Sequence, residues 1–271
     1  MKLEQPLADK WQRLLYQIGE YSSAIVAFSG GVDSSLLAYA THLVLSEKML
    51  AVTVDSGFDS QTQLSQAESF ALQYGIPWKK LSIPLFNNEK IISNPPERCY
   101  FCKLTILTAL RDYARQNHFA VVLEGQNADD LLVYRPGRRA VQETETYSPL
   151  LEQQLTKTEI RQIARALGLA VWEAESSPCL ATRVPYHTPI TQKILKQIEE
   201  AEAYLKGKGF THVRVRYHQQ LARIEVAPQE IDALTAAHFD IVQKFHELGF
   251  QYITVDLEGY RSGSMDEGVT R

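Results

Sequence analysis

The segment from residue 24 to residue 39 constrains the fold of this chain more than any other part of it. It opens with a short apolar run, Ala24-Ile25-Val26-Ala27-Phe28, which is typical of a buried parallel strand. Next come Ser29-Gly30-Gly31-Val32-Asp33-Ser34 and then Ser35-Leu36-Leu37-Ala38-Tyr39, where apolar residues take up helical spacing. The sequence therefore predicts a strand, a glycine turn and a helix N-terminus in direct succession.

The glycine turn predicts an anion-binding site. Backbone N–H groups at the start of a helix have no partner within the helix, and the positive end of the helix dipole lies at the same place. Gly30 and Gly31 let an anion approach the backbone closely because they carry no Cβ. Ser29 and Ser34 can donate further hydrogen bonds. An alternative stays open, in which these residues form a tight strand-to-helix turn without a ligand.

The residues of the turn argue against two classes of nucleotide-binding protein and favour a third. It lacks the lysine of a P-loop and the third glycine of a dinucleotide fingerprint. Ser-Gly-Gly-x-Asp-Ser instead resembles the motif of PP-loop ATP pyrophosphatases. That resemblance implies a site for the β,γ-pyrophosphate of ATP and attack at the α-phosphate, which leaves an adenylate. Asp33 fits such a site if it helps to hold Mg²⁺.

Strands and helices alternate after the glycine turn. Further strands are predicted at residues 50–54, 79–83 and 120–123, with helices at 61–74 and 103–116. This order predicts an α/β fold, with a parallel sheet that has helices on both faces. Ligands of such sheets bind beyond the carboxyl ends of the strands. Asp55, Gly125 and Asn127 follow strands at that edge and are therefore candidate nucleotide-binding residues.

The pattern changes in the last third of the chain. A helix with a capping box is predicted at 156–167, and a loop rich in Ser, Pro and Thr follows at 174–189. Beyond it we expect a helix at 190–206, strands at 212–217 and 221–226, helical residues at 229–248 and a strand at 252–256. The predicted domains are 1–188, an ATP pyrophosphatase domain, and 189–271, a small α+β domain for substrate binding or oligomerisation. The tail at 262–268 is expected to be loose.

Composition narrows the functional classes. Of 271 residues, 45% are hydrophobic and 22% are charged, which is ordinary for a globular protein with a full core. The net charge of -4 argues against a protein dominated by nonspecific nucleic-acid binding. The first residues show no apolar core of a signal peptide, and no apolar run is long enough to span a bilayer. We therefore expect a cytoplasmic protein with neither a membrane nor a nucleic acid as partner.

The chain has three cysteines, which structural disulfides explain poorly in a reducing compartment. Cys99 and Cys102 form a Cys-x-x-Cys pair at a predicted helix start, where a thiolate is favoured, and Cys179 lies in the 174–189 loop. Several interpretations stay open. The thiols could bind a structural zinc with His187, form a redox pair, hold a [4Fe–4S] cluster with one open iron, or be unrelated.

Two predicted strands place charged residues on one side. In Val213-Arg214-Val215-Arg216 both arginines face one side of the strand, and Arg223 and Glu225 share a face on the next strand. These residues could form exposed salt bridges, worth under about 1 kcal/mol each. They could instead hold a phosphate or a carboxylate, because guanidinium groups match those anions. Glu202 and Glu225 could also join a metal site, although their spacing does not require one.

Six segments together resemble the LarE family and cover nearly the whole chain. They are Ser29–Ser34, Arg98–Lys103, Glu124–Asp130, Ser177–Arg183, Val213–Arg216 with Ala222–Glu225, and Gly259–Ser264. The resemblance implies an ATP-dependent sulfurtransferase that acts in the assembly of the nickel-pincer nucleotide, the cofactor of lactate racemase. ATP adenylates a carboxylate of pyridinium-3,5-biscarboxylic acid mononucleotide, pyrophosphate leaves, and a sulfur nucleophile displaces AMP to give a thiocarboxylate.

The resemblance also implies roles for residues. Ser29, Gly30, Gly31, Asp33 and Ser34 should bind the ATP phosphates, and Arg183, Arg214 and Arg216 should hold the anionic substrate. Family members with one cysteine sacrifice the sulfur at the position of Cys179, whereas members with three cysteines resemble enzymes with a [4Fe–4S] cluster whose open iron carries sulfide. Since this chain has all three, we expect Cys99, Cys102 and Cys179 to bind the cluster. Gln126 departs from related loops, which often have Thr.

Two alternative functions stay open, and a sulfur donor and further copies of the chain are expected as partners. A tRNA thiolase or an amidating ligase could use the same ATP fold, although the acidic net charge does not suggest an RNA surface. A nucleotide-binding sensor with structural zinc and no turnover is an alternative from another class. The sulfur source is expected to be sulfide or a sulfur donor, and by resemblance alone the protein is expected to be a homo-oligomer.

Overall fold

The computed structural model describes residues 3–131, 137–174 and 178–261. Ser177, residues 262–264 of the last motif and the predicted loose tail lie outside the described residues. Contacts divide the chain into two compact units. The N-terminal unit comprises Met1–Pro84 and Cys99–Ser177, and the C-terminal unit comprises Leu85–Arg98 and Pro178–Arg271. The domain boundary between residues 188 and 189 stays a prediction.

A parallel sheet forms the centre of the N-terminal unit. Its strands are β1 (Ala24–Ala27), β2 (Met49–Asp55), β3 (Trp78–Ser82) and β4 (Val121–Leu123), in the order β3-β2-β1-β4. All neighbouring strands are parallel, and Ala24 of β1 lies opposite both Met49 of β2 and Val121 of β4. This topology confirms the predicted α/β fold and gathers the carboxyl ends of the four strands at one edge.

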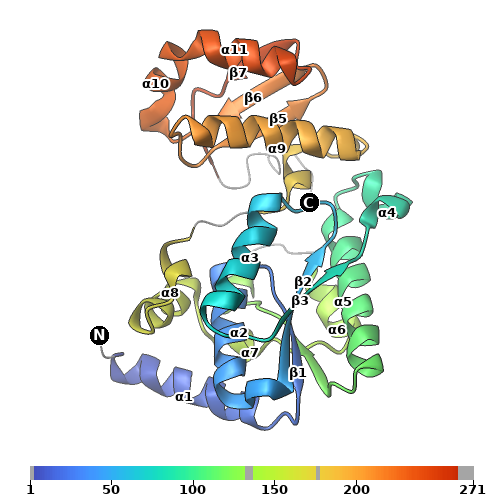
Figure 1. The fold of residues 1–271 in the computed structure, drawn as a ribbon, viewed down its shortest axis with the longest axis vertical. Helices are drawn as coiled ribbons and strands as arrows, with labels where there is room; N and C mark the ends of the chain where they lie inside the picture. The colour runs from blue at the N-terminus through green and yellow to red at the C-terminus, as the bar shows by residue number, and fades with distance from the viewer. Residues whose placement is uncertain (1–2, 132–136, 175–177, 262–271) are drawn as a thin grey trace. The chain divides into compact units, whose positions relative to one another are not determined.

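Helices cover both faces of this sheet (Figure 1). One core cluster joins Val26 to apolar residues of α1 (Gln5–Gly19), α2 (Val32–Leu45), α3 (Gln61–Gln73) and α8 (Lys157–Ala166). On the opposite face Ile25 belongs to a second cluster, with residues of α5 (Arg98–Gln116) and α6 (Gly137–Glu143). Neighbouring residues of β1 thus point to opposite cores, because side chains alternate along a strand.

Local sequence signals set several helix ends. Thr156 and Glu159 form the predicted capping box at the start of α8, and Gly75 follows α3 with φ +64°. The predicted start of α5 at Lys103 is wrong, because the helix begins at Arg98 and its first turns contain the Cys-x-x-Cys pair. The short helix α7 (Pro149–Glu152) precedes α8.

The C-terminal unit is a small α+β fold. After the short α4 (Glu89–Ile92), its elements are α9 (Gln192–Gly207), β5 (Arg214–His218), β6 (Leu221–Glu225), α10 (Ile231–Ala236), α11 (His238–Glu247) and β7 (Tyr252–Val255). The sheet order is β5-β6-β7, with β5 antiparallel and β7 parallel to β6. The predicted order is confirmed, and the helical stretch at 229–248 divides at Ala237 into α10 and α11.

Membrane-crossing helices are absent from the described part of the chain, since none of its helices combines the required length with the required apolar character.

Candidate functional site

The glycine turn after β1 has a backbone that only glycine fits comfortably. Gly30 has φ +78°, and a Cβ at this position would stand 3.0 Å from the Cα and Cβ of Ala67 in α3. The N–H of Ser29 donates to Ser34 Oγ at 3.2 Å, and that hydroxyl donates to the carbonyl of Gly31 at 3.1 Å. Gly31 is the N-cap of α2 and has no side chain to cap it. The first-turn amides of α2 can therefore receive an anion.

Asp33 lies in the first turn of α2, and its carboxylate forms an ion pair with a distant lysine. Lys157 Nζ is 2.6 Å from Asp33 Oδ2, whereas the buried Oδ1 has no hydrogen bond of good geometry within the described residues. Burial raises the pKa of Asp33 above its ordinary value, and the nearby charge of Asp130 acts in the same direction. Lys157 opposes this rise in pKa, as does the amide of Asn127 more weakly. Lys157 thus favours the ionised form of a carboxylate that burial disfavours.

The loop after β4 packs directly against the glycine turn. A Cβ on Gly125 would lie 3.1 Å from the backbone nitrogen of Ser34. The two backbones therefore pack so closely that a side chain at residue 125 would force one of them to move. Asn127 orders the loop, because its N–H donates to Asp130 Oδ2 at 3.2 Å and its Oδ1 accepts from the N–H of Asp129 at 3.0 Å. Two predicted nucleotide-binding residues, Gly125 and Asn127, therefore lie beside the glycine turn.

The turn after β2 shares the same edge of the sheet, because β1 and β2 are adjacent and parallel. Asp55 is the last residue of β2, and its carboxylate is 3.9 Å from Lys80 Nζ on β3. Ser56 orders the turn by donating to Asp59 at 2.7 Å and accepting from the N–H of Phe58 at 3.1 Å. The edge position of Asp55 is as predicted, and its contact with a nucleotide stays a prediction.

A second ion pair links the cysteine-bearing helix to the end of β4. Lys103 directly follows Cys102 in α5, and its Nζ is 2.8 Å from Glu124 Oε2. Glu124 is buried and also accepts from the N–H of Gln126 at 3.2 Å and from the hydroxyl of Ser148. This pair anchors the N-terminal part of α5 at the edge of the sheet where the glycine turn lies.

The cysteines divide between the two units. Cys99 is exposed and Cys102 half-buried in the first turns of α5, and their spacing of three places them on one side of the helix. Cys179 is half-buried in the C-terminal unit, where its carbonyl accepts from the N–H and the hydroxyl of Thr182. All three carry thiols and form no disulfide. Within the described ranges, no three Cys, His, Asp or Glu side chains form a group that could hold a metal ion.

The residues just before the Cys-x-x-Cys pair hold the loop that follows Cys179. Arg98 is buried, and its Nη1 donates to the carbonyl of Ala181 at 3.0 Å and to the side chain of Asn94. Asn94 in turn donates to the carbonyl of Pro185 at 2.7 Å. Within the C-terminal unit, the segment that leads into Cys99 is therefore bonded to the segment that carries Cys179.

Arg183 forms a buried bidentate ion pair with Glu202. The two nitrogen–oxygen distances are 2.8 Å and 3.0 Å, and the side chains are 2% and 5% exposed. Glu202 Oε1 also accepts from the N–H of Val215 at 3.0 Å, and Arg183 donates to the carbonyl of Pro178 at 2.7 Å. Glu202 thus satisfies a guanidinium and a strand amide in this structure, and its role with a metal stays open.

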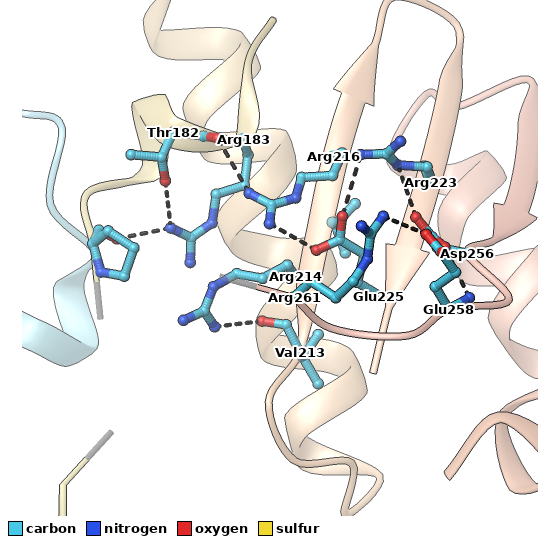
Figure 2. Close-up of polar contacts among 12 residues, drawn as sticks. Thr182, Arg183, Val213, Arg214, Arg216, Arg223, Glu225, Asp256, Glu258 and Arg261 are labelled. Atoms are coloured by element: carbon cyan, nitrogen blue, oxygen red, sulfur yellow. Dashed lines mark hydrogen bonds and ion pairs between the residues drawn. The ribbon is translucent and has the colours of Figure 1, made fainter. Parts of the chain in front are cut away.

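The arginines of β5 lie on the face opposite the apolar core, as the alternation of residues predicts (Figure 2). Arg216 Nη2 is 2.7 Å from Glu225 Oε2, and Arg223 contacts the other oxygen of Glu225 at 3.2 Å. Arg214 donates to the carbonyl of Val213 at 2.8 Å and lies over the ring of Tyr260.

The charged residues of β5 and β6 do not form the exposed salt bridges that were one of the two sequence-based interpretations. Arg214, Arg216 and Glu225 are all buried, and their charges lie close together (Figure 2). Burial, followed by the positive charge of Arg183, lowers the pKa of Arg214 from its ordinary value. A cluster of desolvated guanidinium groups is a favourable place for a phosphate or a carboxylate, although the sequence interpretation of these residues as substrate ligands stays a prediction.

Three features escaped the sequence interpretation. The capping box predicted at the start of the 156–167 helix gives Lys157 no charge partner, and the sequence patterns predict neither the Lys103–Glu124 pair nor the Asn94–Arg98 contact. One signal did exist for Lys157. A cation in the first turn of a helix opposes the helix dipole at a cost of about 0.3–1 kcal/mol, which a nearby anion would offset.

The chain is similar to several known proteins. A family model for NAD synthase matches residues 9–92, which contain the glycine turn and strands β1 to β3. An uncharacterised protein of Synechocystis is 39% identical, over 98% of this chain and 100% of its own length. The pyridinium-3,5-bisthiocarboxylic acid mononucleotide synthase of Lactiplantibacillus plantarum is 34% identical, over 98% of this chain and 96% of its own length. An uncharacterised protein of Methanocaldococcus jannaschii is 33% identical, over 97% of both chains.

The similarity to the synthase extends through both compact units and therefore exceeds what a shared nucleotide-binding fold would produce. Because it covers 98% of this chain, it spans the segments that carry the glycine turn, the cysteines and the buried arginines. The chain belongs to the LarE family, the family of the Lactiplantibacillus plantarum synthase.

Proposed function

We propose that this protein is an ATP-dependent sulfurtransferase that converts a carboxylate of pyridinium-3,5-biscarboxylic acid mononucleotide into a thiocarboxylate, a step in nickel-pincer nucleotide biosynthesis. One observation carries the proposal: the end-to-end identity with a synthase named for the bisthiocarboxylic acid product. The glycine turn at the carboxyl edge of the parallel sheet supports it, because it offers backbone amides for phosphates.

The chemistry has two steps. A substrate carboxylate oxygen attacks the α-phosphorus of ATP, the bond to the β-phosphate oxygen breaks, and pyrophosphate leaves an acyl adenylate. A hydrosulfide then attacks the acyl carbon, AMP leaves with the electron pair of the broken C–O bond, and the thioacid loses a proton to give the thiocarboxylate. Adenylation is required because a carboxylate is a poor electrophile until one oxygen becomes part of a good leaving group.

The residues of the glycine turn would perform the first step. Ser29, Gly30, Gly31 and Ser34 would bind the β- and γ-phosphates through backbone and hydroxyl donors and orient the α-phosphate toward the substrate. Asp33 fits a Mg²⁺ ligand, because it offers a carboxylate whose buried Oδ1 has no well-formed hydrogen bond among the described residues. Mg²⁺ bound there would neutralise charge on the phosphates as pyrophosphate forms.

The buried arginines of the C-terminal unit would hold the anionic substrate. Arg214 and Arg216 present guanidinium groups from neighbouring positions of one strand face, and Arg183 contributes a third charge close to Arg214. Phosphate and carboxylate groups both match the planar donor fork of arginine. The substrate carries both groups, so its position would be set by at least two anionic contacts.

The donor set of the chain fits a [4Fe–4S] cluster in chemical type, because it comprises three thiols and clusters of this kind are held by thiolates. Cys99, Cys102 and Cys179 would hold the cluster, which would supply sulfide as the nucleophile. Two of these thiols lie in one unit and the third in the other, so neither unit contains the whole set. Sacrifice of the Cys179 sulfur is the competing route for the same reaction.

To test the reaction, protein purified in the absence of oxygen is mixed with ATP, Mg²⁺, sulfide and the biscarboxylic acid mononucleotide. We expect pyrophosphate, AMP and the thiocarboxylate product to form in equal amounts, and the mass of the product should reflect replacement of one oxygen by sulfur. Formation of pyrophosphate with glutamine or ammonia as acceptor, or salt-sensitive tRNA binding, would favour an amidating ligase or a tRNA thiolase. ATP binding without any turnover would favour a sensor.

The sulfur source is tested separately by counting iron, sulfide and zinc in the same protein. The cluster version predicts brown protein with about four iron per chain, and loss of that iron in Cys99→Ala. The sacrificial version predicts colourless protein in which only Cys179→Ala is severely impaired, with dehydroalanine at residue 179 after turnover. Stoichiometric zinc would contradict the cluster version and leave the proposed reaction in place.

A further inference from the structure

The segment after β7 carries the last of the six motifs, Gly259–Ser264, and the proposed reaction gives this motif no role. Residues 259–261 of it are described. Here the chain returns to the end of β6, because the N–H of Tyr260 donates to the carbonyl of Val226 at 2.7 Å. Tyr260 is therefore tied through its backbone to the sheet that carries the buried arginines.

Gly259 makes this return possible. It is buried and has φ +71°, and a Cβ at this position would lie 2.8 Å from the carbonyl oxygen of Val226 and 3.1 Å from the backbone nitrogen of Pro228. A side chain at residue 259 would push the segment away from β6, because backbone atoms cannot yield as the end of a flexible side chain can. The place of Tyr260 is thus set by the backbone of its neighbour.

The ring of Tyr260 lies between two residues from the start of β5. Its centroid is 4.9 Å from the Cζ of Arg214, within the range of a cation–π contact. The imidazole of His212 is stacked with the same ring, with centroids 5.8 Å apart and planes inclined by 17°. His212 is exposed, Tyr260 half-buried and Arg214 buried, so the ring connects the surface with the buried guanidinium.

The guanidinium groups of this face are held by two kinds of contact. Arg183 and Arg216 form ion pairs with the buried carboxylates of Glu202 and Glu225. Arg214, by contrast, lies over an aromatic ring. A carboxylate occupies N–H groups of a guanidinium, whereas a ring face attracts the cation without occupying the donors in its plane. An aromatic contact therefore suits a guanidinium that must be oriented and still bind an anion.

We propose that Tyr260 is a positioning residue whose ring holds the guanidinium of Arg214 in the orientation that receives an anionic group of the substrate nucleotide. The proposal rests on the proposed function, because that function assigns Arg214 to this substrate. Tyr260 acts through Arg214 and not by contact with the reacting atoms. Gly259 serves the same end, because a larger residue there would displace the ring.

The test measures by calorimetry how the biscarboxylic acid mononucleotide binds to the wild type, Tyr260→Leu and Tyr260→Phe. We expect Tyr260→Leu to bind about threefold to thirtyfold more weakly, since it loses the cation–π contact. Tyr260→Phe keeps the ring and should stay within about twofold of the wild type. In an Arg214→Met background, Tyr260→Leu should weaken binding by less than about twofold further, because two residues that act as one unit are not additive.

Tyr204→Leu is the matched control. Tyr204 of α9 lies in the same unit and also has a cation over its ring, since Lys208 Nζ is 5.4 Å from the ring centroid. Its loss should change the affinity for the mononucleotide by less than about twofold. A loss as large as that in Tyr260→Leu would mean that any tyrosine removed from this unit has the effect, and would overturn the proposal.

A second measurement needs no substrate. In protein labelled with ¹⁵N-arginine, Arg214→Lys identifies the Nε–H signal of Arg214 by its disappearance. We expect this proton to exchange with water at least about tenfold faster in Tyr260→Leu and at the wild-type rate in Tyr260→Phe.

The outcomes separate this inference from the proposed function. Unchanged exchange in Tyr260→Leu, equal weakening by Phe and Leu at residue 260, or additive losses in the double variant would each overturn the role of Tyr260. Wild-type protein that binds no mononucleotide would refute the proposed function, and the exchange of the Arg214 proton would still decide whether Tyr260 holds that side chain.

Discussion

The glycine turn and the buried arginine face arrange charge in opposite ways. At the glycine turn, backbone amides provide most of the polar groups, and the Asp33–Lys157 ion pair lies partly exposed. On the arginine face, guanidinium groups and carboxylates are buried together, and Arg183–Glu202 and Arg216–Glu225 are nearly inaccessible to water. An exposed pair gains little energy, whereas breaking a buried pair leaves an uncompensated charge in a medium of low dielectric constant.

The difference shows what each region is suited to do. A weakly held pair can exchange its partners for a charged ligand at low cost, which suits the repeated binding and release of phosphates that we propose for the glycine turn. A buried network keeps its geometry, so it can present fixed guanidinium groups and also stabilise the unit that contains it. The same substitution, carboxylate to amide, should therefore change function in one region and stability in the other.

The largest effect on stability is expected from Glu202→Gln. This change removes the charge that faces Arg183 and should lower the free energy of opening of β5 and β6 by about 3–5 kcal/mol. Native-state hydrogen exchange of the β5 and β6 amides measures this quantity within the C-terminal unit. Glu200→Gln on the same helix is the control, because its partner Lys196 is exposed and the loss should stay below about 0.5 kcal/mol. Similar losses in the two variants would remove the contrast between buried and exposed pairs.

Asp33→Asn tests the glycine turn, the region with the partly exposed ion pair. Because burial already opposes the charged form of Asp33, neutralising it should change the stability of the N-terminal unit by less than about 1 kcal/mol. ATP-dependent pyrophosphate release should fall by at least about a hundredfold, since the amide is a poorer Mg²⁺ ligand. Chemical denaturation and a pyrophosphate assay on the same sample measure both quantities. A large loss of stability with intact turnover would reverse the assignment of the two regions.

Gly125→Ala probes how tightly the glycine turn is packed. The added methyl would meet the backbone of Ser34 at 3.1 Å, so the loop must move, at a cost of about 1–3 kcal/mol. The affinity for α,β-methylene ATP should fall together with stability, as calorimetry and denaturation would report. Gly207→Ala is the matched control, because open space surrounds this position, and it should stabilise by up to about 1 kcal/mol. Equal behaviour of the two variants would show that the close contact at Gly125 is unimportant.

The smallest effect concerns the pH dependence of the arginine face. Partial burial, and then the charges of Arg223 and Arg216, lower the pKa of His218, while Glu225 opposes them. The unfolded chain then binds a proton more readily than the folded chain, so stability is lost as pH falls below about 6.5. His218→Asn should match the wild type above about pH 7.5 and lose less stability at lower pH. Melting temperatures at several pH values would show this, and parallel curves for the two proteins would contradict it.

Local features were predictable from the sequence because their causes lie within a few residues. The glycine turn, the capping box of α8 and the alternation of β5 all depend on neighbouring side chains and backbone geometry. The predicted start of α5 at Lys103 is wrong because the helix begins at Arg98, which is held by Asn94 and by the carbonyl of Ala181. That contact joins residues that are distant in the sequence, so local propensity does not report it.

By itself the sequence determined a strand, a glycine turn and a helix that can receive a phosphate, together with the α/β order of the elements around them. Only the tertiary structure decided that Lys157 pairs with Asp33 and that the arginines of β5 are buried instead of solvated. The physical reason is the separation along the chain of the residues that interact. Backbone conformation follows from the steric and hydrogen-bonding properties of adjacent residues, whereas burial and charge pairing depend on which distant segments the fold brings together.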